Sequence, residues 1–301
     1  MFDLIMIVGP TAVGKTRLSI EIAKTFDGEI INGDSMQFYK GLDIGTAKIK
    51  EAEKQGITHH LIDILEPSDN FSVAIYQKLV RAKIEDIKSR SKLPIIVGGS
   101  GLYLNSIIND YQFMGKERTI EKADIYQDLE TEELAEILKR EKPLLAKNTD
   151  LSNRRRVLRA LEKNDSDVQD KLVPYYENIL IIGLELDREI LYKRINERVH
   201  KMIDLGLLSE VEALYKSQVN GQALQAIGYK ELFPYFEDKI SFIDAVELIK
   251  QNSRRYAKRQ MTWFKNKMNV TWFKVEADNF SLTIDHIIEF IKKTINTNNY
   301  N

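Results

Sequence analysis

Cysteine is absent from this chain of 301 residues. Its absence excludes disulfide bonds, thiolate zinc sites and a cysteine nucleophile, and we expect a cytoplasmic protein. Histidine is scarce, with four residues, of which His59 and His60 are adjacent. Adjacent residues of a strand point to opposite faces, and no third ligand has suitable spacing. We therefore interpret both histidines as structural and predict no metal site there.

Long hydrophobic runs are also missing. No stretch approaches the roughly 20 apolar residues of a membrane span, and the run at residues 4–8 is too short for the core of a signal peptide. The formal net charge of −1 indicates no class of partner, so only the local distribution of charge is informative. The length predicts two domains, or one large domain with an insertion. The hydrophobic content of 43% is normal for a globular chain with a core.

A phosphate-binding motif follows the first apolar run. Its residues are Gly9, Pro10, Thr11, Ala12, Val13, Gly14, Lys15 and Thr16, which fit G-x-x-x-x-G-K-[ST]. A predicted buried strand precedes the motif and a helical pattern follows it. In that context backbone N–H groups and a helix N-terminus converge on one anion, Lys15 reaches phosphate oxygens, and Thr16 binds Mg²⁺. The motif predicts a diphosphate or polyphosphate ligand without specifying the molecule that carries it.

Strand and helix signals alternate around this motif, which predicts an α/β fold with a P-loop NTPase-like parallel sheet. Strands are expected at residues 29–32, 92–97, 178–184 and 270–275, and an amphipathic helix at residues 72–87. Asp34 follows the strand at 29–32, and ligands of such sheets bind at the carboxyl ends of strands. A site role beside the P-loop and a plain turn or N-cap role are about equally supported for Asp34. Gly98 and Gly99 stand where a Walker-B Asp would end the strand at 92–97, which disfavours an ATPase or a GTPase.

The composition changes between residues 114 and 176, where charge density rises and leucines recur at helical spacings. We predict a helical insertion domain there, with a core domain formed by residues 1–113 and 177–301. Arg155, Arg156 and Arg159 share or adjoin one face of a predicted helix. Four arginines and no acid in six residues favour phosphate contact over a solvated face.

A second basic segment lies at residues 252–267, where no acid interrupts the cations. Arg255 and Arg259 form an i,i+4 like-charge pair, which costs helix stability. Together with Lys258 and the interleaved aromatic residues, the pair predicts contact with a polyanion that offsets this cost.

These motifs resemble one family, the tRNA dimethylallyltransferases of bacterial type. Residues 9–16 are similar to its GPTAxGKT motif, and residues 34–48 to its DSxQxYxGxDIGTAK motif. Further similar segments follow in family order at residues 59–63, 98–103, 159–162, 226–229 and 258–264. The P-loop is generic, whereas the long segment that begins at Asp34 is specific to the family. The sequence as given carries no zinc-finger extension of the eukaryotic kind.

The resemblance implies the reaction. Dimethylallyl diphosphate donates its prenyl group to N6 of adenine 37, in tRNAs that read codons beginning with U, and pyrophosphate leaves. It implies that the P-loop holds the diphosphate, that Lys15, Thr16 and Mg²⁺ stabilise the leaving charge, and that Asp34 is the general base. The implied partners are dimethylallyl diphosphate and the tRNA anticodon stem-loop, and we expect a monomer. The residues expected to contact tRNA are Asp34, Ser35, Met36, Gln37, Ser100, Arg155, Arg156, Arg159, Gln225, Arg255, Lys258 and Arg259.

Two positions depart from the family pattern. Some members have Arg where Gln225 stands, and Asn153 with its neighbours differs from the usual N-D-x-x-R. Two other readings remain open. A P-loop kinase for a nucleoside or small metabolite would explain residues 9–16 but not the basic segments. A nucleotide-switched RNA-binding protein would need the base-reading NKxD motif, and residues 266–269 end in Asn.

Overall fold

Six parallel strands form a single sheet in the order β3-β2-β4-β1-β5-β6. This computed structural model describes residues 2–111, 126, 128–162, 173–219 and 221–298. The strands are β1 (Leu4–Val8), β2 (Gly28–Asn32), β3 (His59–His60), β4 (Leu93–Val97), β5 (Ile179–Glu185) and β6 (Thr271–Lys274). The predicted strands therefore lie on β2, β4, β5 and β6, and the α/β fold is confirmed.

Contacts divide the chain into two compact units. One unit comprises Met1–Asn109 with Pro174–Asn301, and the other comprises Asp110–Val173. Sequence analysis predicts the insertion at 114–176, and its first residues lie outside the described part of the chain. The helices of the larger unit are α1 (Lys15–Thr25), α2 (Glu51–Lys54), α3 (Val73–Ser89), α4 (Gly101–Ile108), α9 (Arg188–Asp204), α10 (Leu207–Lys216), η2 (Gln222–Gln225), α11 (Phe233–Phe236), α12 (Phe242–Lys267) and α13 (Phe280–Asn298).

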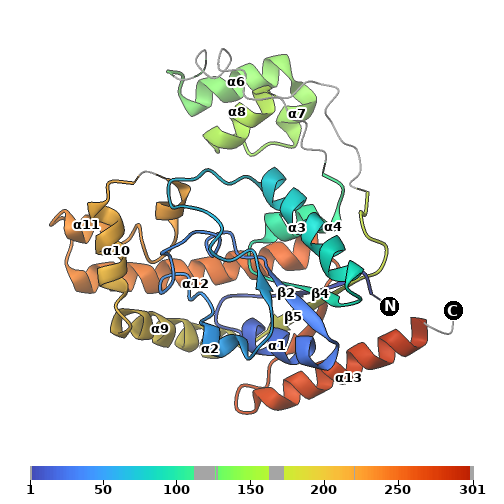
Figure 1. Ribbon diagram of the computed structural model, residues 1–301. Coiled ribbons are helices and arrows are strands. Elements are labelled where there is room, and N and C mark those ends of the chain that lie inside the picture. The colour runs from blue at the N-terminus through green and yellow to red at the C-terminus, as the bar shows by residue number, and fades with distance from the viewer. Residues whose placement is uncertain (1, 112–125, 127, 163–172, 220, 299–301) are drawn as a thin grey trace. The chain divides into compact units, whose positions relative to one another are not determined.

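The inner strands are buried on both faces, because helices cover each side of the sheet. Along β1, Ile5 and Ile7 pack into one apolar cluster with α1 and α13, whereas Leu4, Met6 and Val8 pack into the other with α3, α4 and part of α12. Alternate residues of a strand point to opposite faces, so a continuous apolar run serves both clusters. In Figure 1, the long helix α12 crosses the picture at the level of the strands, and α13 lies below them. No helix among the described residues is long and apolar enough to cross a bilayer.

The sheet order places three loops together. Strand β4 lies between β2 and β1, and all three run parallel. The loops at their carboxyl ends begin at Gly9, Gly33 and Gly98, and they therefore meet at one edge. A Cβ at Gly98 would lie 2.1 Å from the carbonyl oxygen of Gly33, so only glycine allows this approach. The edge carries the P-loop, the Asp34 segment and Ser100.

Two glycines with positive φ separate helices of the larger unit. The 3₁₀ turn η2 ends at Gln225 and α11 begins only at Phe233. Between them, Gly228 has a φ of +100°, which interrupts a helical path. Gly206 has a φ of +101° and separates α9 from α10.

A buried carboxylate on β2 links that strand to the edge strand β3. Glu29 is 3% exposed and receives two hydrogen bonds from the Arg90 guanidinium. Nε2 of His60 lies 2.7 Å from its second oxygen, while Nδ1 of His59 lies 2.8 Å from the carbonyl of Ile57. Both histidines are thus accounted for by structural hydrogen bonds. The Arg90 hydrogen bond is the main cause that lowers the pKa of Glu29 to about 2.

This pairing predicts an acid-sensitive fold. Because the folded pKa of Glu29 lies below its ordinary value of 4.5, the pair stabilises the protein above pH 4.5 and the contribution is lost as pH falls toward 2. We expect Glu29→Gln to lower the free energy of unfolding at pH 7 by at most about 3 kcal/mol and to flatten its acid dependence. Urea unfolding at pH 7 and pH 3.5 measures both effects. An equal loss at the two pH values would contradict the assignment.

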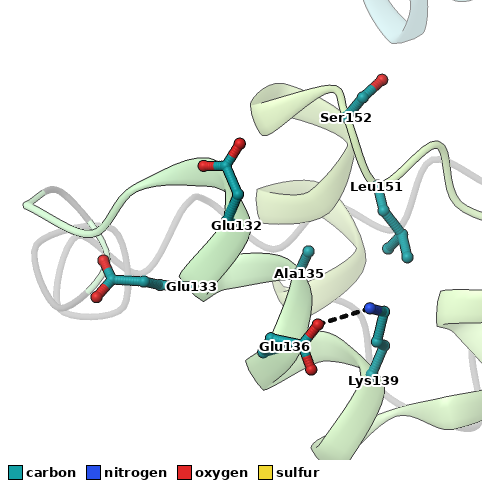
Figure 2. A pocket seen from close by; sticks show the side chains of 7 residues that line it. All are labelled: Glu132, Glu133, Ala135, Glu136, Lys139, Leu151 and Ser152. Carbon is teal, nitrogen blue, oxygen red and sulfur yellow. Dashed lines mark hydrogen bonds and ion pairs between the residues drawn. The ribbon is translucent and has the colours of Figure 1, made fainter.

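The smaller unit packs three described helices around its own apolar cluster. They are α6 (Thr131–Glu141), α7 (Pro143–Lys147) and α8 (Arg154–Glu162), with Leu134, Leu138 and Val157 fully buried between them. Figure 2 shows a pocket of this unit that is lined by Glu132, Glu133 and Glu136. Lys139 is the cation in its lining and is paired with Glu136 at 2.6 Å. The pocket is therefore unsuited to bind phosphate.

Candidate functional site

The P-loop lies between β1 and α1. Gly9 and Gly14 have φ angles of +143° and +109°, which glycine adopts without strain. A Cβ on Gly14 would lie 2.6 Å from the ring of Phe280, the first residue of α13, so close packing also requires glycine there. Helix α1 starts at Lys15 with no side-chain cap on its free N–H groups. These groups, with the positive end of the helix dipole, form an anion site.

Lys15 folds back onto its own loop. Its Nζ donates hydrogen bonds to the carbonyl oxygens of Gly9 at 2.9 Å and Pro10 at 2.8 Å. The pKa of Lys15 is lowered to about 7, mainly by burial, with the Asp34 carboxylate opposing the shift and the nearby Arg198 contributing to it. A cation in this position is poorly compensated by the protein alone. An anion bound to the loop would supply the missing counter-charge.

Asp34 adopts a side-chain-stabilised turn after β2. Its Oδ1 accepts from the backbone N–H of Met36 at 3.0 Å, and its own N–H donates to Oδ1 of Asn32 at 2.9 Å. The two roles weighed for Asp34 are thus compatible, because one oxygen shapes the turn while the second has no protein hydrogen bond among the described residues. The backbone N–H of Ser35 donates to Oγ of Ser100 at 3.1 Å. This bond joins the ends of β2 and β4.

Helix α12 closes one side of the site through Gln260 and Tyr256. Oε1 of Gln260 accepts from the backbone N–H of Thr11, and Nε2 donates to the carbonyl of Gly99, both at 3.0 Å. Gln260 therefore ties the P-loop to the end of β4. Burial raises the pKa of the Tyr256 hydroxyl, with a further contribution from the Asp34 carboxylate. Neither residue was assigned a role from the sequence.

Arg198 of α9 is the cation that sequence analysis missed. Burial lowers the pKa of its guanidinium, and the Asp34 carboxylate opposes that effect. Its Nη2 donates to the carbonyl of Thr46 at 3.3 Å, and no other hydrogen bond of this side chain occurs within the described ranges. A sequence signal existed, because position 198 is three residues after Ile195 and four before Met202 in the buried stripe of α9. A charge on an apolar face indicates a function or a partner.

The predicted cationic residues of α12 are exposed. Arg255, Lys258 and Arg259 lie at i, i+3 and i+4, and no ion pair involves them in the described part of the chain. Arg259 stands 5.8 Å from the centre of the Tyr256 ring. The helix thus presents Tyr256 and Gln260 to the P-loop region and its cations to solvent. This arrangement suits a polyanion that reaches into the site.

The arginines of α8 are not equivalent. Arg154 donates to the carbonyls of Leu129 and Tyr126 and so serves the packing of its own unit. Arg156 is paired with Asp150 at 3.2 Å. The exposed side chains at 155 and 159 have no ion pair among the residues described. Oδ1 of Asn153, whose role the family pattern left open, accepts from the backbone N–H of residue 156 and caps the helix.

The remaining predicted site residues differ in their exposure and in their hydrogen bonds. Nε2 of Gln37 donates to the carbonyl of Thr46 at 3.2 Å, and Met36 is half-buried against the core. Thr16 is exposed at the start of α1, so its hydroxyl is available to a magnesium ion held mainly by phosphate and water oxygens. Gln225 is exposed, and no hydrogen bond joins it to the P-loop in the portion described. No group of three acidic or histidine side chains that could hold a metal occurs among the described residues.

Comparisons with known proteins identify the family of this chain. The sequence model of the family described as IPP transferase matches residues 37–267. A tRNA dimethylallyltransferase of Anoxybacillus flavithermus is 50% identical over 302 residues, covering 96% of either chain. That of Bacillus subtilis is 50% identical over 282 residues and 90% of either chain.

Solved structures give the same result. The full-length tRNA isopentenylpyrophosphate transferase of Bacillus halodurans is 42% identical and superposes with a TM-score of 0.76, over 98% of this chain and 97% of that chain. A eukaryotic dimethylallyltransferase, captured acting on tRNA, is 28% identical with a TM-score of 0.85, over 98% of this chain and 79% of that one. The chain therefore belongs to the IPP transferase family, the family of the tRNA dimethylallyltransferases.

Proposed function

We propose that this enzyme transfers the dimethylallyl group of dimethylallyl diphosphate to N6 of adenine 37 in tRNA. The observation that carries the proposal is the convergence of an anion-binding P-loop, two partly buried cations and one carboxylate. Lys15 and Arg198 both interact electrostatically with Asp34 at the shared edge of β1, β2 and β4. A leaving diphosphate requires the cations, and an amine nucleophile requires the carboxylate.

The diphosphate occupies the P-loop in this proposal. As the allylic C–O bond breaks, negative charge grows on the departing pyrophosphate. Lys15 and the N–H groups at the start of α1 are already in place to stabilise that charge, and Arg198 faces the same region. A magnesium ion held by Thr16 and the phosphate oxygens would neutralise further charge on the leaving group. The diphosphate then replaces Asp34 as the counter-ion of both cations.

Asp34 is the proposed general base. The exocyclic amine of adenine is a weak nucleophile, because its lone pair is delocalised into the ring, so removal of its proton assists formation of the C–N bond. The Asp34 turn keeps one carboxylate oxygen engaged with Met36 and leaves the other for the substrate. General-base catalysis contributes on the order of 10²–10⁴-fold in rate.

Adenine must leave its stack to reach Asp34. In a single-stranded anticodon loop that step costs a few kcal/mol or less. Cations on α12, and those at 155 and 159 on α8, would then hold the tRNA backbone. Such contacts set the register of the RNA without reading its sequence. The preference for tRNAs that read codons beginning with U belongs to this proposal as well.

Removing two cations of α12 should weaken tRNA binding in a salt-dependent way. We expect Arg255→Ala with Arg259→Ala to raise the KM for tRNA and to reduce the slope of log Kd against log salt by about 2, or about 1 for each lost phosphate contact. Filter binding at four salt concentrations measures the slope. The double variant Lys292→Ala with Lys293→Ala removes the same charge from exposed positions of α13 and should leave the slope unchanged. An unchanged slope in the α12 variant would place the tRNA elsewhere.

Transfer of labelled prenyl groups tests the proposed function. Wild-type protein with Mg²⁺, dimethylallyl diphosphate and unmodified tRNA should yield labelled tRNA and an equal amount of pyrophosphate. The competing kinase function predicts that ATP is consumed with a nucleoside or small metabolite and no tRNA. That result, without labelled tRNA, would overturn the proposal.

A further inference from the structure

The loop between Asp34 and β3 is held by a carboxylate from α10. Oε2 of Glu210 accepts from the backbone N–H groups of Asp43 at 3.1 Å and Ile44 at 2.8 Å. Its Oε1 accepts from the N–H of Gly45 at 3.0 Å and from the hydroxyl of Tyr229 at 2.6 Å. Three successive N–H groups thus form an anion-binding concavity, and Glu210 fills it. Four donors on one carboxylate form a strong, directional clamp.

The clamp continues into the site through one carbonyl. The residue after Gly45 is Thr46, whose carbonyl oxygen accepts from Nη2 of Arg198 at 3.3 Å and from Nε2 of Gln37 at 3.2 Å. The bond from Arg198 to the Thr46 carbonyl orients the guanidinium near Asp34. A displacement of the backbone of residues 43–45 would therefore move the Thr46 carbonyl, to which the Arg198 guanidinium donates.

The surroundings leave the clamp little freedom. A Cβ on Gly45 would lie 2.4 Å from the ring of Tyr229, which is fully buried. Glu210 is three residues after Leu207, on the buried side of α10, where an acid is unexpected. Its place on that face is explained by the loop it binds, because it is not paired with a cation in any described contact.

We propose that Glu210 is a positioning residue of the transferase: by fixing the backbone of residues 43–45, it sets the Thr46 carbonyl that orients Arg198 toward the diphosphate. The inference rests on the proposed function, because it assumes that diphosphate binds between the P-loop and Arg198. It concerns affinity for the diphosphate and not for tRNA. A purely structural role of Glu210 would instead lower stability and leave diphosphate affinity unchanged.

The test is a double-mutant cycle read by calorimetric binding of inorganic pyrophosphate with Mg²⁺. Glu210→Gln places an amide NH₂ against backbone donors, and we expect it to weaken pyrophosphate binding by about tenfold, since hydrogen bonds to the charged carboxylate are lost. In an Arg198→Met background the same change should weaken binding less than twofold, because coupled residues are not additive. Tyr229→Phe removes one of the four donors and should give a smaller loss with the fold retained.

Glu29→Gln is the matched control, since it alters a buried glutamate at the edge of the sheet and should lower the melting temperature without changing pyrophosphate affinity. Equal losses for Glu210→Gln in the wild-type and Arg198→Met backgrounds would overturn the inference, as would unchanged affinity in both Glu210→Gln and Tyr229→Phe. If wild-type protein binds no pyrophosphate, the proposed function fails together with this inference. If wild type binds it and the clamp variants do so equally well, only the inference fails.

Discussion

Asp34→Asn should reduce prenyl transfer by on the order of 10²–10⁴-fold while tRNA binding stays near the wild-type value. Asparagine keeps an oxygen that can accept from the Met36 N–H, so the turn after β2 is preserved. The substitution removes the carboxylate charge that interacts electrostatically with Lys15 and Arg198. Single-turnover kinetics with saturating substrates isolate the chemical step from binding.

A matched variant controls for the effect of an Asp→Asn change in a capping turn away from the site. Asp187 caps α9 by accepting from the backbone N–H of Glu189 at 2.9 Å, and asparagine caps helices equally well. Asp187→Asn should therefore transfer the prenyl group at the wild-type rate. If Asp34→Asn retains turnover within a few-fold of wild type, Asp34 is not the base and the proton leaves by another route.

Lys15→Met should give a protein that is at least as stable as wild type but transfers the prenyl group roughly 10²–10³-fold more slowly. The loss is that expected when one group that stabilises developing negative charge is removed. The stability follows from the pKa of Lys15, lowered by burial to about 7. Because the folded protein binds this proton less tightly than the unfolded chain does, the buried cation costs stability below about pH 7, and stability rises with pH from there to the ordinary value of 10.5. Methionine removes that cost.

Thermal unfolding and initial rates measured on the same preparation test this pairing of effects. Lys24→Met is the control, because Lys24 is exposed on the same helix and paired with Glu21 at 3.1 Å. It should change neither quantity appreciably. A Lys15→Met protein that loses both activity and several degrees of melting temperature would show that Lys15 is needed for folding, and that its role in charge stabilisation is unsupported.

The fold was predictable because its signals are local. Strands β1 and β4 are short apolar runs followed by glycine, and the P-loop is recognised by the strand before it and the helix after it. The rule that ligands sit at the carboxyl ends of parallel strands placed Asp34 beside that loop. Ser100 was expected there only from the family resemblance. The structure brings both to the same edge, joined through Ser35.

The site residues that the sequence did not reveal are brought together by long-range packing. Arg198, Gln260 and Glu210 reach the site region from α9, α12 and α10, and each is a polar residue on a buried helix face. A search for polar residues inside apolar stripes would have found all three, but not their partners, which lie 152, 249 and 166 residues away in the chain. Basic runs alone could not show that Arg154 and Arg156 have partners within their own unit, whereas positions 155 and 159 have no ion pair with any residue that the structure describes.

The central claim is that the P-loop of this protein binds an allylic diphosphate whose prenyl group moves to adenine 37. The most direct measurement is mass analysis of nucleosides and of anticodon-loop fragments from unmodified tRNA, after incubation with Mg²⁺, dimethylallyl diphosphate and either wild-type or Asp34→Asn protein. The account predicts one dimethylallyl mass gain, located on adenosine 37 and nearly absent with the variant. A gain at another nucleoside, or no gain while ATP is consumed, would contradict it.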